Sequence, residues 1–147
     1  RDILARSSRG VAADQPDRCH WEMLGFEAVH RDLTRTVELL RRRGRKGVRI
    51  LVTVSPIPLK VSFSGMDILV ANTEAKSILR AAVGQVVAEH PDVAYVPSYE
   101  SIVLSRAPGI WANDLRHVSD AFIAKVIDRL IDAYFTPATS AAAQAAD

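Results

Sequence analysis

Val48-Arg49-Ile50-Leu51-Val52-Thr53-Val54 is the segment of this sequence that most clearly predicts a β-strand. It is rich in β-branched residues and is bounded by Gly47 and Pro56, which favour turns. Its apolar character is nearly continuous, as in parallel strands that are covered on both faces. The segment therefore predicts a strand of a parallel sheet. Its place in the order helix–strand–helix–strand–helix, described below, predicts an α/β protein.

A helical pattern precedes this strand. From Trp21 onward, apolar residues recur every three or four positions, at Phe26, Val29, Leu33, Val37 and Leu40. The pattern ends in Arg41-Arg42-Arg43-Gly44, where the cations suit the negative end of a helix and the glycine suits the C′ position. We therefore expect a helix that runs from Trp21 to this basic terminus.

A second helix and a second strand follow. Asn72 or Thr73 can cap the helix, and Pro91 ends it. The segment 93–96 predicts a short strand, and the residues 97–100 predict a turn out of it.

A third helix begins after Ser119, which we expect to cap it. Its predicted inward face consists of Ile123, Val126, Ile127, Leu130 and Tyr134.

Two strands make a small sheet, so further strands could come from residues 61–70, from another chain or from a region before residue 1. We favour the last source, and we expect these residues alone to be poorly soluble or to associate, because the sheet would be incompletely covered.

Composition narrows the classes of function. The 147 residues are enough for one domain, and the net charge of +2 is too small to imply nucleic acid or an anionic membrane as a partner. The basic run 41–46 lacks an aromatic platform, so we interpret it as a solvated helix end; a nucleic-acid binder is a weaker alternative. No apolar run is long enough to span a membrane. The localisation is left open, and the first residue, Arg1, suggests a processed chain or a fragment.

The sequence predicts no metal or cofactor site. Cys19 and His20 are adjacent, but no second pair of ligands stands at the spacing of a zinc site. With a single cysteine, the chain cannot form an internal disulfide.

Asp114-Leu115-Arg116-His117, just before the last helix, carries the clearest chemical pattern. A carboxylate and an imidazole at this spacing can act as orienter and general base for a nucleophile supplied from elsewhere. No glycine-flanked turn surrounds Ser55, and no strand precedes Ser7 or Ser8, so none of these serines predicts a nucleophile. A solvated loop with a helix-capping carboxylate is the alternative for Asp114 and His117.

Other candidates follow the two strands, because sites in open parallel sheets form beyond the carboxyl ends of the strands. Ser55, Tyr99 and Glu100 could line a substrate cleft there, with turn and packing roles as the alternative. Lys76 and Arg80 are expected to be solvated, with binding of an anionic group as the alternative.

Four blocks of the sequence, in order, resemble the GSCFA family. They are residues 53–59 (Thr-Val-Ser-Pro-Ile-Pro-Leu), 71–80, 95–100 (Tyr-Val-Pro-Ser-Tyr-Glu) and Asp114-Leu115-Arg116-His117. The resemblance runs from about residue 22 to residue 135. The GSCFA family is similar to the SGNH (GDSL-like) esterases and lipases, which implies a three-layer flavodoxin-like fold with a parallel sheet, here incomplete at the N-terminus.

This resemblance implies a catalytic role for the last block. In SGNH enzymes an Asp-x-x-His block supplies two members of a Ser-His-Asp triad, so His117 would be the general base and Asp114 its orienter. The serine and the oxyanion donors belong to earlier blocks, and this sequence contains neither a GSCFA motif nor a Gly-Asp-Ser motif. We therefore expect an irregular segment at 1–20, the C-terminal part of a GSCFA domain at 21–135, and an Ala-rich tail at 136–147.

The expected function is thus part of a serine-type ester hydrolase or acyltransferase that uses no cofactor. The resemblance implies a small-molecule or carbohydrate ester as substrate. Without the nucleophile, the 147 residues alone are expected to be inactive. The alternative is a non-catalytic α/β interaction module that keeps the fold without the nucleophile.

Overall fold

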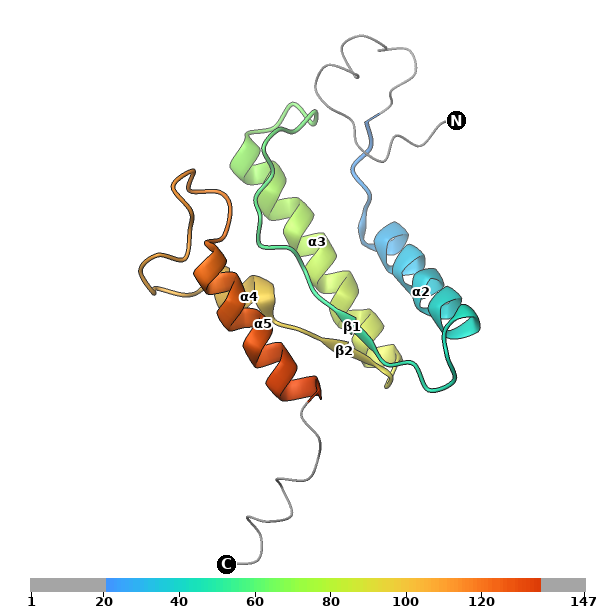
Figure 1. Cartoon of the computed structure of the whole chain (residues 1–147). Coiled ribbons are helices and arrows are strands. Elements are labelled where there is room, and N and C mark those ends of the chain that lie inside the picture. Colours follow the sequence, from blue (N-terminus) through green and yellow to red (C-terminus); the bar gives the residue numbers. More distant parts are fainter. Residues whose placement is uncertain (1–20, 136–147) are drawn as a thin grey trace, which may run out of the picture.

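The computed structural model describes residues 21–135 (Figure 1). The expectations for Ser7, Ser8, Cys19 and His20, for the segment 1–20 and for the tail 136–147 lie outside these residues. Within them, the order is helix, strand, helix, strand and two further helices, which confirms a mixed α/β fold.

Two short strands form a parallel sheet. Strand β1 (Ile50–Val52) pairs with β2 (Val93–Tyr95) so that Ile50 lies opposite Val93 and Val52 opposite Tyr95. Both strands lie within the predicted segments but are shorter, because only three residues of each are paired. Residues 61–70 provide no further strand, since residues 61–67 form a loop and α3 begins at Ile68.

Helix α2 (Phe26–Arg43) packs against α3 (Ile68–Glu89), and the core lies between them and the sheet. This core joins the buried Val37, Val86 and Val93 to four half-buried apolar residues, Leu33, Ile50, Val52 and Val87. Burial of these aliphatic side chains is the main stabilising contribution on this side of the strands.

Both ends of α2 differ from the prediction. The helix begins at Phe26, five residues after Trp21. Gly44 follows its last turn but has an extended backbone (φ −77°, ψ 173°) instead of the left-handed one expected at C′. A side chain is disfavoured there for another reason, because a Cβ at Gly44 would lie 2.6 Å from the carbonyl oxygen of Leu40.

Helix α3 starts earlier than predicted. Asp67 caps the helix, and its carboxylate accepts a hydrogen bond of 2.8 Å from the amide of Leu69. Asn72 and Thr73, the predicted caps, lie inside the helix, where the hydroxyl of Thr73 donates to the carbonyl oxygen of Leu69. Two residues, Leu69 and Val70, are strongly exposed, so the apolar start of α3 does not face the core.

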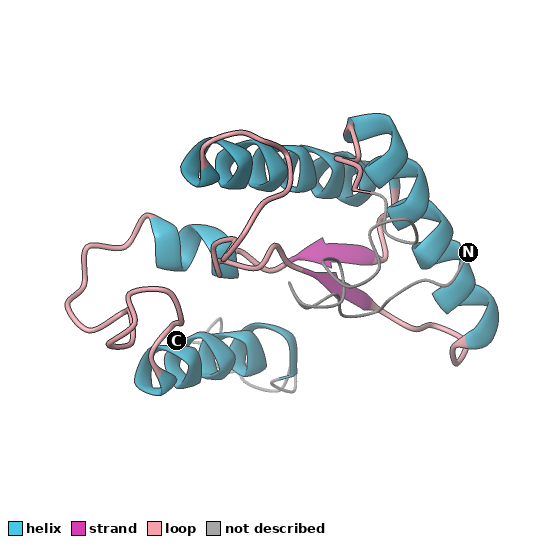
Figure 2. Ribbon diagram, turned by 90° about the horizontal axis from the view of Figure 1, so that it is seen from above, coloured by secondary structure: helices cyan, strands magenta, loops and turns pink. Residues whose placement is uncertain are grey.

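Two helices follow β2. Residues predicted as a turn begin the short helix α4 (Ser98–Val103), and α5 (Asp120–Phe135) comes after a long loop. Ser119 directly precedes α5, and its carbonyl oxygen accepts from the amides of Phe122 and Ile123 at 3.0 Å, as expected of the N-cap position. Its hydroxyl donates to the carbonyl oxygen of Gly109 at 2.6 Å. Figure 2 shows α3 and α5 on opposite sides of the two strands.

Of the five residues predicted to face inward on α5, three are half-buried and two are exposed. Phe122, Val126, Leu130 and Tyr134 are half-buried, whereas Ile123 and Ile127 are exposed. Within the described residues, no helix is long and apolar enough to cross a membrane.

Candidate functional site

The loop that carries Asp114 and His117 is closed by backbone hydrogen bonds at its base. Trp111 and Val118 form an isolated antiparallel bridge, and the amide of Ala112 donates to the carbonyl oxygen of His117 at 2.8 Å. Behind the bridge lies a small core of Ile102, Ile110 and Val118, against which Trp111 and Phe122 pack. The loop is therefore anchored to both α4 and α5 by buried apolar side chains.

Asp114 organises the tip of this loop. One carboxylate oxygen, Oδ1, accepts hydrogen bonds from the amides of Arg116 (3.1 Å) and His117 (2.9 Å). The other oxygen, Oδ2, lies 2.5 Å from Nδ1 of His117. Leu115 has a positive φ of 53°, a conformation uncommon for residues other than glycine, and it carries the chain around the carboxylate.

These contacts fix the charge of Asp114. The amide of His117, followed by the His117 ring and the amide of Arg116, holds the pKa of this carboxyl well below its usual range. An ionised carboxylate beside Nδ1 favours the imidazole tautomer with the proton on Nδ1. Nε2 then carries a lone pair, and this nitrogen lies 3.3 Å from Nη1 of Arg116. Both side chains of this pair are about half-exposed to solvent.

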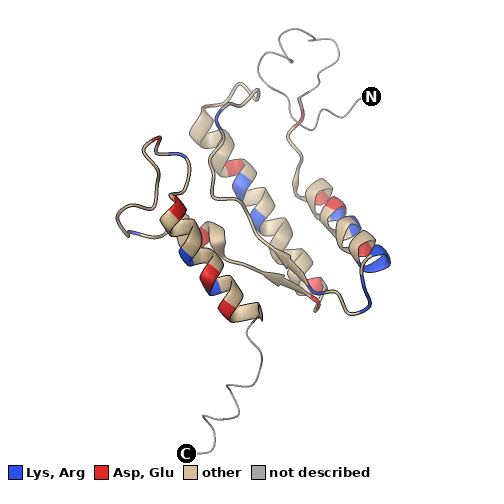
Figure 3. Ribbon diagram, viewed as in Figure 1, with Lys and Arg blue, Asp and Glu red and all other residues tan. Residues whose placement is uncertain are grey.

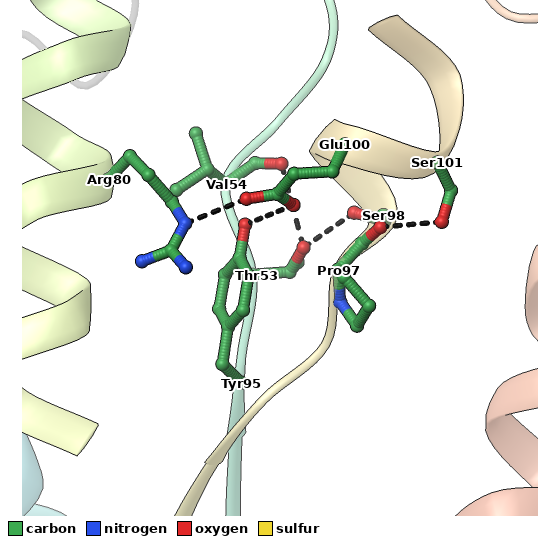
Figure 4. Close-up of polar contacts among 8 residues, drawn as sticks. All are labelled: Thr53, Val54, Arg80, Tyr95, Pro97, Ser98, Glu100 and Ser101. Carbon is green, nitrogen blue, oxygen red and sulfur yellow. Dashed lines mark hydrogen bonds and ion pairs between the residues drawn. The ribbon is translucent and has the colours of Figure 1, made fainter. Parts of the chain in front are cut away.

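A second polar cluster lies where the strands end. Nε of Arg80 donates to Glu100 at 2.7 Å, and the hydroxyl of Tyr95 donates to the other oxygen of Glu100 at 2.7 Å (Figure 4). The Arg80 guanidinium also lies over the Tyr95 ring, with Cζ 4.2 Å from its centroid. Beside them, the hydroxyls of Thr53 and Ser98 are 2.5 Å apart.

The cluster shifts the acidity of two of its members. Burial, together with the carboxylate of Glu100, raises the pKa of Tyr95 to about 12. Burial alone would raise the pKa of Glu100, but the hydrogen bonds from Tyr95 and Arg80 outweigh it and lower this pKa. Glu100 is thus an anion whose two oxygens are both occupied by partners within the chain.

One face of α3 holds both loops that follow the strands. Asn72, Lys76 and Arg80 are spaced four residues apart, so they share this face. Asn72 accepts from the amide of Leu59 at 3.0 Å, Lys76 donates to the carbonyl oxygen of Ser55 at 2.7 Å, and Arg80 binds Glu100. Sequence reasoning placed Lys76 and Arg80 in solvent and missed this role. The four-residue spacing was the available signal.

Lys76 is buried, with 8% of its surface exposed, so its expected solvation is wrong. This burial lowers the pKa of its amine.

The predicted cleft residues have different surroundings. The hydroxyl of Ser55 accepts from the amide of Ile57 at 3.3 Å, which is a local turn contact. Glu100 belongs to the cluster with Arg80 and Tyr95. Tyr99 lines an open pocket with residues of α3. The structure therefore brings Tyr99 and Glu100 to α3, next to Lys76 and Arg80.

The basic residues near the end of α2 are visible in Figure 3. Arg41 binds the carboxylate of Asp92, the residue just before β2, with Nε 2.8 Å from Oδ2, and this contact links the helix to the sheet. In the part of the chain that the structure describes, no three His, Cys, Asp or Glu side chains gather as metal ligands would.

Comparison with known proteins identifies the family. Residues 7–130 match the GSCFA family, a span that begins before the expected domain start at residue 21 and includes all four blocks named above. No curated protein and no solved structure gave a match. Because the family match covers most of the chain, this protein belongs to the GSCFA family.

Proposed function

We propose that this chain supplies the acid–base part of a serine-type ester hydrolase or acyltransferase site. The observation that carries the proposal is the 2.5 Å contact between Nδ1 of His117 and the ionised carboxylate of Asp114. In a Ser-His-Asp triad the carboxylate has this same position relative to the base. The amides of Arg116 and His117 hold the carboxylate in place before any substrate binds.

In the proposed reaction, Nε2 of His117 accepts the proton of a serine hydroxyl as the serine oxygen attacks the ester carbonyl. Asp114 stabilises the imidazolium that forms and keeps its ring oriented. His117 then returns the proton to the leaving alcohol, and an acyl-enzyme remains. Water or an acceptor alcohol, deprotonated in turn by His117, releases the acyl group and completes hydrolysis or transfer.

The serine and the oxyanion donors of this proposal lie outside the 147 residues. Among the described residues, no serine hydroxyl is hydrogen-bonded to His117, whose ring contacts are with Asp114 and Arg116. The guanidinium of Arg116 lies where the nucleophile would approach Nε2, so it has to move away when the site is assembled. These residues alone are accordingly proposed to be inactive.

The placement of α3 and α5 on opposite sides of the strands supports a three-layer flavodoxin-like domain, completed by strands from outside residues 1–147 (Figure 2). The proposed extent of the family domain within the chain is 21–135. The proposed substrate is a small acyl ester or a carbohydrate ester, by analogy with SGNH enzymes.

The test uses the full-length protein and its reactivity toward a fluorophosphonate probe and simple acyl esters. Replacing His117 by Ala should lower ester turnover by about 10³-fold or more, because the serine loses its base. His30→Gln is the matched control, since His30 lies on α2 and binds Glu89. Circular dichroism of each variant reports whether the fold is retained.

Two results would count against the proposal. Unchanged ester turnover in folded His117→Ala would remove the catalytic role of His117. A full-length protein that neither reacts with the probe nor hydrolyses esters would favour the non-catalytic interaction module instead.

A further inference from the structure

An open pocket of about 350 Å³ lies between one face of α3 and the start of α4. Its lining consists of Lys76, Ser77, Arg80, Ala81, Gly84 and Tyr99. Two residues with cationic side chains, two with hydroxyl groups and two small residues therefore line this space. No residue of the loop around Asp114 and His117 contributes to it.

Lys76 is the buried cation of this pocket. Its amine has three N–H donors, and the described residues provide one hydrogen-bond acceptor, the carbonyl oxygen of Ser55 at 2.7 Å. Only 8% of Lys76 is exposed, so its positive charge is poorly solvated. A carbonyl dipole does not neutralise that charge, whereas a bound anion would.

Arg80 is the second cation. Its Nε donates to Glu100, which leaves the two terminal nitrogens without a hydrogen-bond partner among the described residues. The guanidinium is fixed by Glu100 and by the Tyr95 ring. Gly84 gives it room, because a Cβ at Gly84 would lie 3.0 Å from Nη1. The donors of Arg80 are thus oriented in advance.

The charges around the pocket leave one positive charge uncompensated. Glu100 offsets Arg80, and the cation of Lys76 has only a backbone carbonyl as its partner among the described residues. A group with one negative charge and several acceptor oxygens would meet the free donors of Lys76 and Arg80. The hydroxyls of Ser77 and Tyr99 could hydrogen-bond to the same group.

We propose that this pocket binds the oxyanion group, a carboxylate or a phosphate, of an organic ligand. Lys76 and the terminal nitrogens of Arg80 are the charged donors, and Ala81 and Gly84 allow the ligand to approach α3 closely. The proposal does not depend on the acid–base role of His117, since it concerns binding and uses other residues.

The test is a titration of the ¹⁵N-labelled full-length protein with inorganic phosphate and, separately, with acetate, at ionic strength held constant with sodium chloride. Amide signals of Ser77 and Gly84 are the reporters. The expected result is a saturable shift with one of the two anions, which also tells a phosphate site from a carboxylate site. Lys76→Met should weaken the binding by about tenfold or more, because it removes a charge-assisted hydrogen bond.

Two variants keep the test decisive. Ser77→Asp places a carboxylate in the pocket at an exposed position and should abolish the saturable shift even if Lys76→Met fails to fold. Lys125→Gln, which removes an exposed lysine of α5, should bind as the unaltered protein does. Shifts that rise linearly with both anions, or that saturate equally in folded Ser77→Asp, would overturn the proposal.

Discussion

Arg80 and Glu100 are twenty residues apart in the sequence, and Nε of Arg80 lies 2.7 Å from Oε1 of Glu100. This contact joins the middle of α3 to the first turn of α4. Tyr95, at the end of β2, donates to the other oxygen of the same carboxylate. Glu100 therefore links α3, β2 and α4 at the edge of the sheet where the strands end.

Glu100→Gln should destabilise the fold by about 1–2 kcal/mol, a discounted value because Arg80 and Glu100 are partly exposed. The pKa of Glu100 is lowered, so its contribution is fully present above the ordinary value of 4.5 and is lost as the pH falls below it. Urea unfolding at pH 7 and at progressively lower pH measures both effects. Glu74→Gln, at an exposed position of α3, is the control, and an equal loss in both variants would contradict the role of the cluster.

Tyr95 should lose its proton only at high pH. Its pKa is raised to about 12, so the folded state favours the neutral phenol. The stability that this hydroxyl contributes is fully present below the ordinary pKa of 10 and is lost as the pH rises from 10 toward 12. An ultraviolet titration of tyrosinate should show a late transition that Tyr95→Phe removes and Tyr99→Phe retains. A late transition that survives in Tyr95→Phe would refute the assignment.

Asp114→Asn tests the orienting role in the full-length protein. The amide can still accept hydrogen bonds from the backbone, but it no longer stabilises an imidazolium, and it favours the wrong tautomer of His117. By analogy with the same change in the triad of serine proteases, kcat for ester hydrolysis should fall by about 10³- to 10⁴-fold. Asp120→Asn, an exposed change in the first turn of α5, should leave kcat unchanged. A loss smaller than about tenfold in Asp114→Asn would refute the orienting role.

Local patterns predicted the parts of the fold that depend on nearby residues. The apolar run around Ile50 predicted β1. The four-residue spacing of Asn72, Lys76 and Arg80 is a local pattern too, and it places them on one face of α3. What those side chains bind could not be predicted, because Ser55 and Glu100 reach α3 only through the packing of the whole sheet.

In the candidate site, too, the contact between residues close in sequence was predicted, and the contacts that depend on the folded backbone were not. Asp114 and His117 are three residues apart, so one loop can bring them into contact, and spacing suggested the pair. The bridge between Trp111 and Val118 that closes the loop, and the contact of Arg116 with Nε2, depend on backbone geometry that no residue pattern showed. The helix start at Asp67 was missed because its apolar first residues are exposed and do not follow the core-facing stripe.

Gly44→Ala should destabilise the junction between α2 and β1. The added Cβ would lie 2.6 Å from the carbonyl oxygen of Leu40, which already accepts the amide of Gly44 at 2.7 Å. Relief requires a backbone shift at the end of α2, with an expected loss of about 1–3 kcal/mol in unfolding free energy. Gly25→Ala is the matched control, since its Cβ would meet only the flexible end of Glu27 at 3.8 Å. Equal stability of the two variants would show that the junction relaxes freely.

Helix α5 should drive self-association when residues 1–147 are expressed alone. Four apolar side chains on one stripe are exposed to between 41% and 66%, namely Ile123, Ile127, Ile131 and Phe135. The half-buried Val126 and Leu130 lie next to this stripe, three residues after Ile123 and Ile127, so the apolar face of α5 is only partly covered. Sedimentation should show concentration-dependent association of these residues.

The double variant Ile123→Gln/Ile127→Gln should weaken that association by more than about tenfold, because burial of each isoleucine contributes roughly 1.5–3 kcal/mol. Leu69→Gln is the control, since Leu69 is 74% exposed but lies on α3, away from the stripe. If Leu69→Gln weakens the association as much as the double variant does, nonspecific hydrophobic contacts explain the association and α5 has no special part in it. If the unaltered 147-residue chain is monomeric, the exposed stripe is tolerated in water and the expectation of association is wrong.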